Sequence, residues 1–342
     1  MSKQYRVAVV GATGAVGHEM RAILAQRRFP ISELLPLASA RSAGIELEFG
    51  IECVECKELG PGSFQDVDLA LFSAGSAVSR EYAPIARDAG CVVIDNSSAW
   101  RMDPAVPLIV PEVNPGDATW HRGIIANPNC STIQMVAALK PLHDEARIKR
   151  IVVSTYQAVS GTGAKAVTEL IRQSDEILEG TPPLIEVYPY QIAFNCLPQI
   201  DVFLEDGSTK EEQKMVDETH KIMGDATIAV TATCVRVPVY NGHSEAVNVE
   251  FERDLSPERA RQILAAAPGI EVRDDPANLV YPMAIIAAGT DPVYVGRIRR
   301  DPTLAHGLNL WVVADNVRKG AALNAVQIAE LLLERDLIRV AS

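Results

Sequence analysis

A glycine pattern close to the start of the chain restricts the possible fold more than any other feature. The β-branched run Arg6–Val10 leads directly into the segment 11–17, Gly-Ala-Thr-Gly-Ala-Val-Gly, and a helical pattern follows it. Glycines between a strand and a helix permit a tight turn and let the backbone approach a pyrophosphate at the helix N-terminus. The pattern predicts a dinucleotide site, although a glycine-rich turn without a ligand has the same spacing. The predicted contacts are Gly11, Thr13, Gly14, Ala15 and Val16.

The end of the next predicted strand indicates which dinucleotide binds. The strand 34–39 is followed by Ala40, Arg41 and Ser42, and no carboxylate stands at its end. NAD sites usually place Asp or Glu there to bind the ribose 2′-hydroxyl, whereas hydroxyl and guanidinium groups suit a 2′-phosphate. We therefore expect NADP, bound through Ser39, Arg41 and Ser42. An exposed arginine in a surface loop is the alternative.

Two further strands are predicted at 67–72 and 91–94, and each ends in small or polar residues. Ligands of a parallel sheet bind at the carboxyl ends of its strands. Ser73 and Gly75, which follow the first of these strands, are therefore added to the predicted cofactor contacts. Residues 1–128 are predicted to form a Rossmann-type, doubly wound α/β domain.

The pattern changes near residue 150. Apolar and polar residues alternate strictly over 246–252, which is typical of a half-buried antiparallel strand. We predict that residues 129–320 form an α+β domain with one largely antiparallel sheet covered by helices. The last helix, within 321–342, carries apolar residues on one face and is expected to pack back on the first domain.

Composition excludes several classes of partner. The chain has 342 residues and a formal net charge of −12, so neither nucleic acid nor an anionic membrane is an expected partner. No apolar run approaches the roughly 18 residues of a membrane span, and the first residues have no signal-peptide pattern, so a cytoplasmic location is expected.

In the reducing cytoplasm, the six cysteines are expected to be thiols and not disulfides. The pair Cys53 and Cys56 has redox or zinc spacing but no second pair, which favours two half-buried structural cysteines and no metal.

Cys130 is placed where a nucleophile would be activated. It follows the turn 127–129, Asn-Pro-Asn, and stands at the start of an apolar helical pattern. The positive end of a helix favours a thiolate over a thiol, although a buried structural cysteine fits the same position. Arg236 stands at the end of a predicted strand, between Val235 and Val237. His243 lies in a loop before the alternating strand, where a lone histidine is more often solvated than catalytic. In a dinucleotide-binding protein, however, cysteine and histidine together indicate thiolate addition to an aldehyde, hydride transfer to nicotinamide and a thioester.

The chain as a whole resembles the aspartate-semialdehyde dehydrogenases of the bacterial type. The motifs that carry the resemblance are the glycine segment 11–17, Asp95–Arg101, Asn127–Thr132, Gln157–Gly163, Arg236 and Gly242–Glu245. Together they span nearly the full length. A related group of proteins shares this fold but lacks the cysteine and the histidine, and because this chain keeps both we expect an active enzyme.

The resemblance implies a role for each matching residue. Cys130 resembles the nucleophile that forms the thioester, His243 the acid or base, and Gln157 the residue that orients the substrate. Arg236 matches the arginine that holds the substrate carboxylate. Glu211 and Lys214 match the pair that meets the substrate amino group and the phosphate, although on their own they would be an ordinary solvated helix face. The remaining implied contacts are Arg101 and Asn129 to phosphate, and Ser160, Gly161 and Asn316 to the nicotinamide half of the cofactor.

The implied reaction is the NADPH-dependent conversion of 4-aspartyl phosphate to aspartate 4-semialdehyde and inorganic phosphate, in lysine, threonine and methionine biosynthesis. The resemblance also implies a homodimer. N-acetyl-glutamyl-phosphate reductase is the nearest enzymatic alternative, but its cysteine typically has Gly before it and an aromatic residue after it, where this chain has Asn129 and Ser131. A non-catalytic NADP-binding homologue is the alternative from another class.

Overall fold

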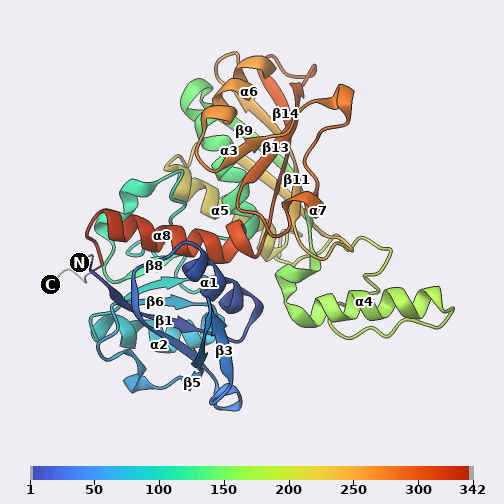
Figure 1. Ribbon diagram of the computed structural model, residues 1–342. Helices are drawn as coiled ribbons and strands as arrows, with labels where there is room; N and C mark the ends of the chain where they lie inside the picture. The colour runs from blue at the N-terminus through green and yellow to red at the C-terminus, as the bar shows by residue number, and fades with distance from the viewer. Residues whose placement is uncertain (1–2, 339–342) are drawn as a thin grey trace. The chain divides into compact units, whose positions relative to one another are not determined.

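The computed structural model describes residues 3–338 (Figure 1). Residues 1–2 of the predicted first domain and residues 339–342 of the predicted last helix lie outside this range. The chain divides into two compact units. The first contains the chain up to Asn129 together with the segment from Ala321 onward, and the second contains Cys130–Gly320. Each unit is described by itself.

The first unit alternates strands and helices. Its elements are β1 (Tyr5–Val10), α1 (Ala15–Gln26), β2 (Ile31–Ala38), β3 (Glu46–Phe49), β4 (Glu52–Glu55), β5 (Lys57–Glu58), β6 (Leu69–Phe72), α2 (Ser76–Asp88), β7 (Val92–Asp95), β8 (Ile124–Ala126) and α8 (Leu323–Glu334). The strands predicted at 34–39, 67–72 and 91–94 are therefore present as β2, β6 and β7, with ends that differ by at most three residues.

These strands form one parallel sheet in the order β5-β2-β1-β6-β7-β8, and β3 and β4 form a separate antiparallel hairpin. The strands are apolar on both faces, as expected when helices cover both sides of a parallel sheet. On one face, Val7 and Val9 pack into a core with Ile23 of α1 and Val326 of α8. Helix α2 contacts β7 and β8. The predicted doubly wound α/β class is confirmed.

The glycine segment joins β1 to α1 in the way that the sequence predicts. Gly11 has φ +84°, and a Cβ there would lie 2.5 Å from the backbone oxygen of Ser73. Its N–H donates to the Leu37 carbonyl at 2.8 Å, which holds the turn against the end of β2. Only glycine fits this position without strain.

The second unit is built around a mixed sheet. Its elements are α3 (Cys130–Ala146), β9 (Ile148–Gln157), α4 (Ala164–Leu178), α5 (Lys210–Met223), β10 (Ala229–Arg236), β11 (His243–Phe251), α6 (Pro257–Ala266), β12 (Ile270–Val272), α7 (Ala284–Ala287), β13 (Val293–Arg300) and β14 (Gly307–Ala314), followed by a π-helical turn at Arg318–Ala322.

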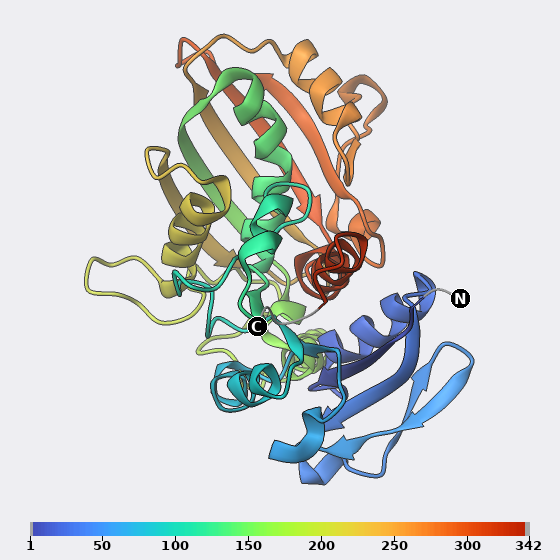
Figure 2. The same cartoon turned by 90° about the vertical axis from the view of Figure 1, so that its left-hand side faces the viewer.

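The strand order of this sheet is β10-β9-β11-β14-β13-β12 (Figure 2). The three central pairings are antiparallel, as predicted, and the two outer pairings, β10 with β9 and β12 with β13, are parallel. Helices α3, α5 and α6 pack against the strands. Along β11, the fully buried Val247 and Val249 alternate with the half-buried Ala246 and Asn248. One face of the sheet is therefore covered by helices and the other is left open.

Among residues 3–338, no helix is long and apolar enough to span a membrane. The same residues contain no cluster of potential metal ligands. Cys53 is exposed on β4 and Cys56 is buried next to it, so the expectation of two half-buried cysteines holds for neither residue. Side chains alternate between the two sides of β4, and Cys53 points to the side that faces solvent. Cys56 lies just past the end of this strand.

Candidate active site

Three of the predicted functional side chains form one row across the sheet of the second unit. The register of β10 with β9 pairs Arg236 with Gln157. The register of β9 with β11 pairs Tyr156 with Ser244, and its continuation by one residue sets His243 beside Gln157. All three side chains of the row are buried. We call this set, Arg236, Gln157 and His243, the catalytic row.

Cys130 is the first residue of α3, as predicted, and is partly exposed. The residues that follow it in the helix are buried, so the thiol lies at the accessible end of a helix inserted into the unit. A Cβ at position 320 would lie 2.7 Å from the Cys130 Cβ, so only glycine leaves room for the nucleophile there. One turn along α3, Gln134 Nε2 donates to the His243 carbonyl at 3.3 Å, which joins this helix to the strand of the catalytic row.

His243 is held by the backbone in one tautomer. Its Nδ1 accepts a hydrogen bond of 3.0 Å from the Ala158 N–H. Because an N–H group only donates, Nδ1 carries no proton and the neutral ring has its proton on Nε2. Within the described residues Nε2 is buried and has no hydrogen-bond partner. Burial, and secondarily the charge of Arg236, hold the pKa of His243 well below its usual range. At neutral pH the ring is therefore an uncharged Nε2–H donor.

Arg236 is a buried cation fixed by backbone contacts. Its Nη1 donates to the Ala158 carbonyl at 2.6 Å, and its own backbone exchanges two hydrogen bonds with Leu197. Among the described residues, no carboxylate forms an ion pair with it. A buried guanidinium without a carboxylate is costly, and a substrate carboxylate would supply the missing partner through two parallel hydrogen bonds.

Polar side chains continue from the catalytic row to α5. Thr155 Oγ1 donates to Gln157 Oε1 at 3.0 Å, and Gln157 Nε2 donates to Glu211 at 3.2 Å. The Lys214 ammonium lies 3.1 Å from Glu211 and 2.8 Å from Asp201. Burial alone would lower the pKa of Lys214, but the two carboxylates outweigh it and raise that pKa. These three charged groups sum to one net negative charge.

The residues predicted for the nicotinamide half lie against the catalytic row. Asn316 Oδ1 accepts the Gly242 N–H at 2.8 Å, and its Nδ2 donates to Ser160 Oγ at 2.9 Å. A Cβ at Gly161 would lie 3.1 Å from Arg236 Nη1 and 3.3 Å from His243 Nε2. The absence of a side chain at Gly161 therefore leaves space directly beside both groups.

The other predicted contacts lie in the first unit. Arg101 is buried, and its guanidinium donates to the carbonyls of Asn96 and Asn127. Asn129 is also buried and directly precedes the nucleophile in the chain. These backbone acceptors fix the orientation of the Arg101 guanidinium, and a guanidinium group is suited to bind a phosphate.

The first unit fits a dinucleotide at the carboxyl ends of β1, β2 and β6. Thr13, Gly14 and Ala15 are exposed at the start of α1, and Val16 is half-buried. Gly14 at the N-cap has no side chain that could cap the helix, so the first-turn N–H groups are available to a phosphate. Past β6, Ser73 is half-buried and Gly75 is exposed, and past β2, Ser39 and Arg41 are exposed and Ser42 is half-buried.

Two alternative interpretations from the sequence, a solvated His243 and a solvated Glu211, are wrong. His243 is the first residue of β11 and is fully buried, because the strand begins three residues before the alternation becomes visible. Glu211 is also buried, because α5 packs on β10 and turns this side chain toward Gln157. Gln157 is the last residue of β9.

Sequence reasoning missed several residues of the site. Thr155 and Glu245 lie two positions from Gln157 and His243 on the same strands and face, so counting by two would have found them. Asp201 and Gly320 come from loop and turn segments, and no local pattern marks either residue.

Comparison with known proteins places the chain in a family. Two family models match it, the NAD binding domain of semialdehyde dehydrogenases over residues 6–121 and their dimerisation domain over residues 139–319. The chain is 59% identical to the aspartate-semialdehyde dehydrogenase of Aquifex aeolicus, over 98% of this chain and 99% of the relative.

Solved structures agree with this result. The crystal structure of aspartate semialdehyde dehydrogenase II complexed with ASA, from Vibrio cholerae, is 50% identical and matches with a TM-score of 0.95, over 97% of this chain and 99% of that chain. The Candida albicans enzyme with NADP is 26% identical, with a TM-score of 0.77, over 98% of this chain and 100% of that chain. The chain belongs to the aspartate-semialdehyde dehydrogenase family.

Proposed function

We propose that this protein is an NADP-dependent, phosphorylating aspartate-semialdehyde dehydrogenase. In the biosynthetic direction it converts 4-aspartyl phosphate and NADPH to aspartate 4-semialdehyde, NADP and inorganic phosphate, a step toward lysine, threonine and methionine. The observation that carries the proposal is the buried row of Arg236, Gln157 and His243 joined to the helix that begins at Cys130.

In the first half of the reaction, the Cys130 thiolate attacks the acyl carbon of the substrate. The bond from that carbon to the phosphate oxygen breaks, inorganic phosphate leaves with the electron pair, and a thioester remains on Cys130. Arg236 holds the α-carboxylate while Gln157, itself fixed by Thr155, orients the acyl group. The proposed phosphate contacts are Arg101, Asn129 and Lys214.

In the second half, His243 acts as a hydrogen-bond donor. NADPH, when bound, supplies the hydride that reduces the thioester carbon. The Nε2–H of His243 donates a hydrogen bond to the carbonyl oxygen and stabilises the oxyanion that forms there, and the proton stays on Nε2. The oxyanion then collapses to the aldehyde as the carbon–sulfur bond breaks, and Cys130 leaves as the thiolate. The lowered pKa of His243 keeps the ring uncharged, so this donor is present at neutral pH.

The choice of NADP is supported by the end of β2. Ser39, Arg41 and Ser42 provide hydroxyls and a cation beside the glycine turn, which the Gly11 N–H joins to Leu37 of β2. The Candida albicans relative was solved with NADP. In the second unit, the proposed contacts are Ser160, Gly161 and Asn316, at the space beside the catalytic row.

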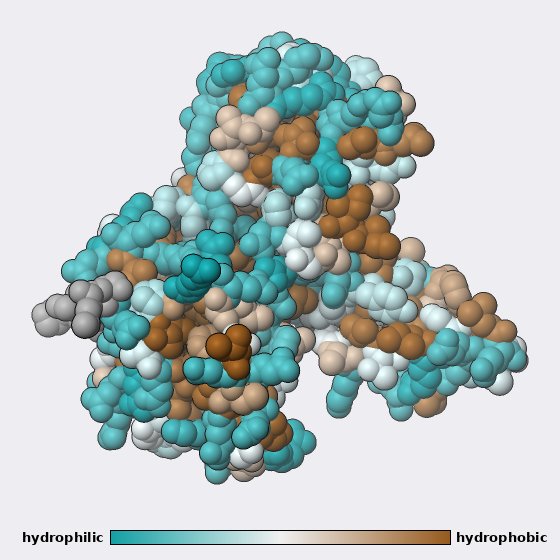
Figure 3. All heavy atoms as spheres, in the orientation of Figure 1, coloured by the Kyte–Doolittle hydropathy of each residue, from teal (hydrophilic) through white to brown (hydrophobic). Residues whose placement is uncertain are grey.

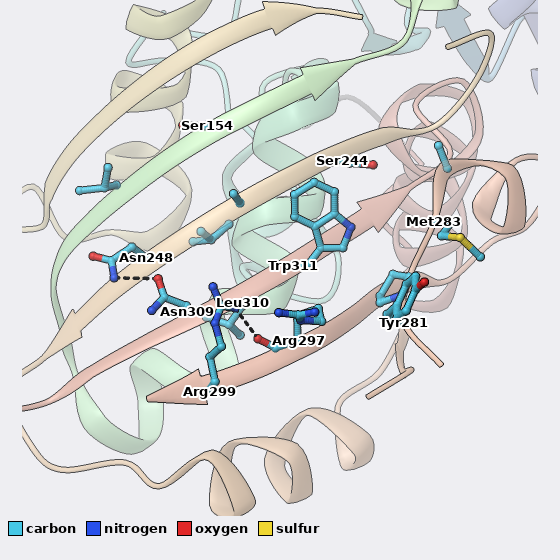
Figure 4. Close-up of a pocket in the computed structure, with 15 residues that line it drawn as sticks. Ser154, Ser244, Asn248, Tyr281, Met283, Arg297, Arg299, Asn309, Leu310 and Trp311 are labelled. Atoms are coloured by element: carbon cyan, nitrogen blue, oxygen red, sulfur yellow. Dashed lines mark hydrogen bonds between the residues drawn. The ribbon is translucent and has the colours of Figure 1, made fainter. Parts of the chain in front are cut away.

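The open face of the second sheet supports a homodimer. A cavity of about 710 Å³ lies on this face, lined by Ser244, Asn248, Tyr281, Arg297 and Trp311 among others (Figure 4). Exposed apolar side chains also gather over α7 and along α4 (Figure 3), namely Ile285, Met283, Ile171 and Leu178. A large exposed apolar face marks an association surface, and the matching family model is a dimerisation domain. We propose that a second copy of this chain covers it.

Cys130→Ser is expected to remove nearly all turnover while NADP binding remains, because a serine hydroxyl is a far weaker nucleophile without a full triad. The assay is phosphate-dependent reduction of NADP with aspartate semialdehyde, run beside N-acetylglutamate semialdehyde. The exposed Cys53→Ser is the control and should keep full activity. Wild-type-like activity in Cys130→Ser would exclude the thioester mechanism, and a preference for the N-acetylated substrate would favour the reductase alternative.

Substitutions in the catalytic row should separate binding from chemistry. Arg236→Lys keeps the charge but loses the planar fork, so it should raise KM for the semialdehyde by about 10-fold or more. His243→Ala should lower kcat by about 10²–10³-fold, the usual cost of removing one hydrogen-bond donor to a developing oxyanion. Steady-state kinetics of both variants measure the split. An unchanged KM in Arg236→Lys would show that Arg236 does not bind the carboxylate.

Arg41→Ala is expected to weaken NADP binding by about 10- to 150-fold and to leave NAD binding almost unchanged, because a charge-assisted hydrogen bond contributes roughly 1.5–3 kcal/mol. Titration calorimetry with both cofactors measures the difference. Arg122→Ala is the control, since this exposed arginine precedes β8 at the opposite edge of the sheet. Equal losses for NAD and NADP in Arg41→Ala would mean that Arg41 does not read the 2′-phosphate.

Ala246→Glu should convert the dimer to a monomer, because it places a charge in the middle of the open face of the sheet. Light scattering after size exclusion should give twice 37.0 kDa for the wild type and 37.0 kDa for the variant. The exposed Ala43→Glu, in the first unit, makes the same change as a control. A dimeric Ala246→Glu would place the interface elsewhere.

A further inference from the structure

A second polar row lies directly behind the catalytic row. The strand registers pair Cys234 with Thr155 and Thr155 with Glu245, while the next row inward contains Val153 and Val247 and is apolar. Thr155 has a defined task, because it fixes Gln157. Glu245 is fully buried and takes no part in the reaction as described above.

The burial of Glu245 is costly. Neither of its carboxyl oxygens has a hydrogen-bond partner within the part of the chain that the structure describes. An ionised carboxylate would be very unfavourable at this position, and such groups remain protonated instead. Accordingly, burial raises the pKa of Glu245 well above its usual range, and only the neighbouring Gln134 side chain opposes this effect.

Gln134 is suited to meet an uncharged carboxyl group. Its Nε2 donates to the His243 carbonyl, which can only accept, and its Oε1 is buried without a partner among the described residues. A carboxylate presents only acceptors to this oxygen, whereas a carboxylic acid carries a hydrogen that the oxygen can accept. The protonated form of Glu245 can therefore donate to the unpartnered Oε1 of Gln134, whereas the ionised form could only accept from the second hydrogen on Nε2.

We propose that Glu245 is a positioning residue that works as an uncharged carboxylic acid and fixes α3 against β11. Gln134 stands one helical turn after Cys130, and Glu245 stands two residues after His243 on the same face of its strand. Through these two neighbours, Glu245 sets the placement of the nucleophile relative to the hydrogen-bond donor. The positioning role rests on the proposed function, whereas the uncharged state of Glu245 does not.

The titratable groups around Glu245 are few. On the same buried side of the sheet, β11 contributes His243, β10 contributes Cys234 and Arg236, α3 begins with Cys130, and α5 contributes Glu211 and Glu212. The residues of β9 and β14 that pair with β11 on this side are Thr155, Gln157 and apolar residues, which do not titrate. A pH effect that disappears in Glu245→Gln is therefore assigned to Glu245 itself.

The first test compares the stability of Glu245→Gln and the wild type in urea between pH 5 and pH 8. A carboxyl group with a raised pKa in the folded protein binds a proton that the unfolded chain releases above about pH 4.5. The stabilisation that the protonated Glu245 contributes is complete below that pH. It is lost as the pH rises toward the pKa of Glu245 in the folded protein. The unfolding constant of the wild type should therefore increase with pH relative to Glu245→Gln, by up to about tenfold per pH unit until the pH reaches the folded pKa. Glu250→Gln, on the opposite face of β11, is the control and should show no such slope. A constant difference between Glu245→Gln and the wild type would overturn the uncharged state.

The second test measures steady-state kinetics with aspartate semialdehyde. Glu245→Gln should keep kcat within about 3-fold, because an amide fills the same space without charge and still forms hydrogen bonds. Glu245→Leu, which suits a buried site and should fold, is expected to lower kcat about 10-fold or more with little change in KM, since Arg236 still binds the carboxylate. Wild-type kcat in Glu245→Leu, or an equal loss in Glu245→Gln, would overturn the positioning role.

The two experiments separate a failure of this inference from a failure of the proposed function. Failure of the proposed function would appear as inactivity of the wild type with aspartate semialdehyde, and the urea experiment would still decide the charge of Glu245.

Discussion

The backbone of one residue, Ala158, holds two side chains of the catalytic row, His243 and Arg236, in place. Its N–H donates to His243 Nδ1, and its carbonyl accepts from Arg236 Nη1. The first contact selects the tautomer of the histidine, and the second fixes the guanidinium where the substrate carboxylate is proposed to bind. Because both contacts use the backbone, the separation between the histidine and the arginine depends on the chain path after β9, not on the side chain at position 158.

Strand register extends this constraint through the unit. The catalytic row lies at the ends of β10 and β9 and the start of β11, with the polar row of Cys234, Thr155 and Glu245 behind it and apolar rows beyond. Since side chains alternate between faces, the same strands carry Tyr156, Ser244 and Ala246 on the open face. A shift of one residue in any of these registers would exchange the catalytic face with the proposed dimer face. The proposed dimer face and the catalytic row therefore belong to one sheet and share no side chains.

Much of this arrangement follows from local sequence pattern, and the rest does not. The glycine segment predicts the first sheet and its cofactor edge because only glycine tolerates the backbone of Gly11 and its contact with Ser73. The position of Cys130 at a helix start is equally local. The burial of His243 and Glu211 is not, because polar residues at the end of a strand or in the first turn of a helix look like solvated positions until packing is known. Parallel pairing at the sheet edges joins strands through long connections, and no periodic sequence pattern predicts which strands pair in this way.

Two opposite charges of the second unit lie at the two ends of the proposed substrate site. Glu211 is buried next to Gln157, and Arg236 is a buried cation of the catalytic row. The proposed aspartyl substrate carries an ammonium group that matches the first and a carboxylate that matches the second. An N-acetylated substrate keeps the carboxylate but has no ammonium, so it would lose the contact proposed for Glu211. A hydrogen bond to a charged group contributes about 1.5–3 kcal/mol, which is similar to the 1–3 kcal/mol that shape alone discriminates for a methylene-sized difference. In the proposed function, charge complementarity therefore adds to fit in selecting the free amino acid over its acetylated relative.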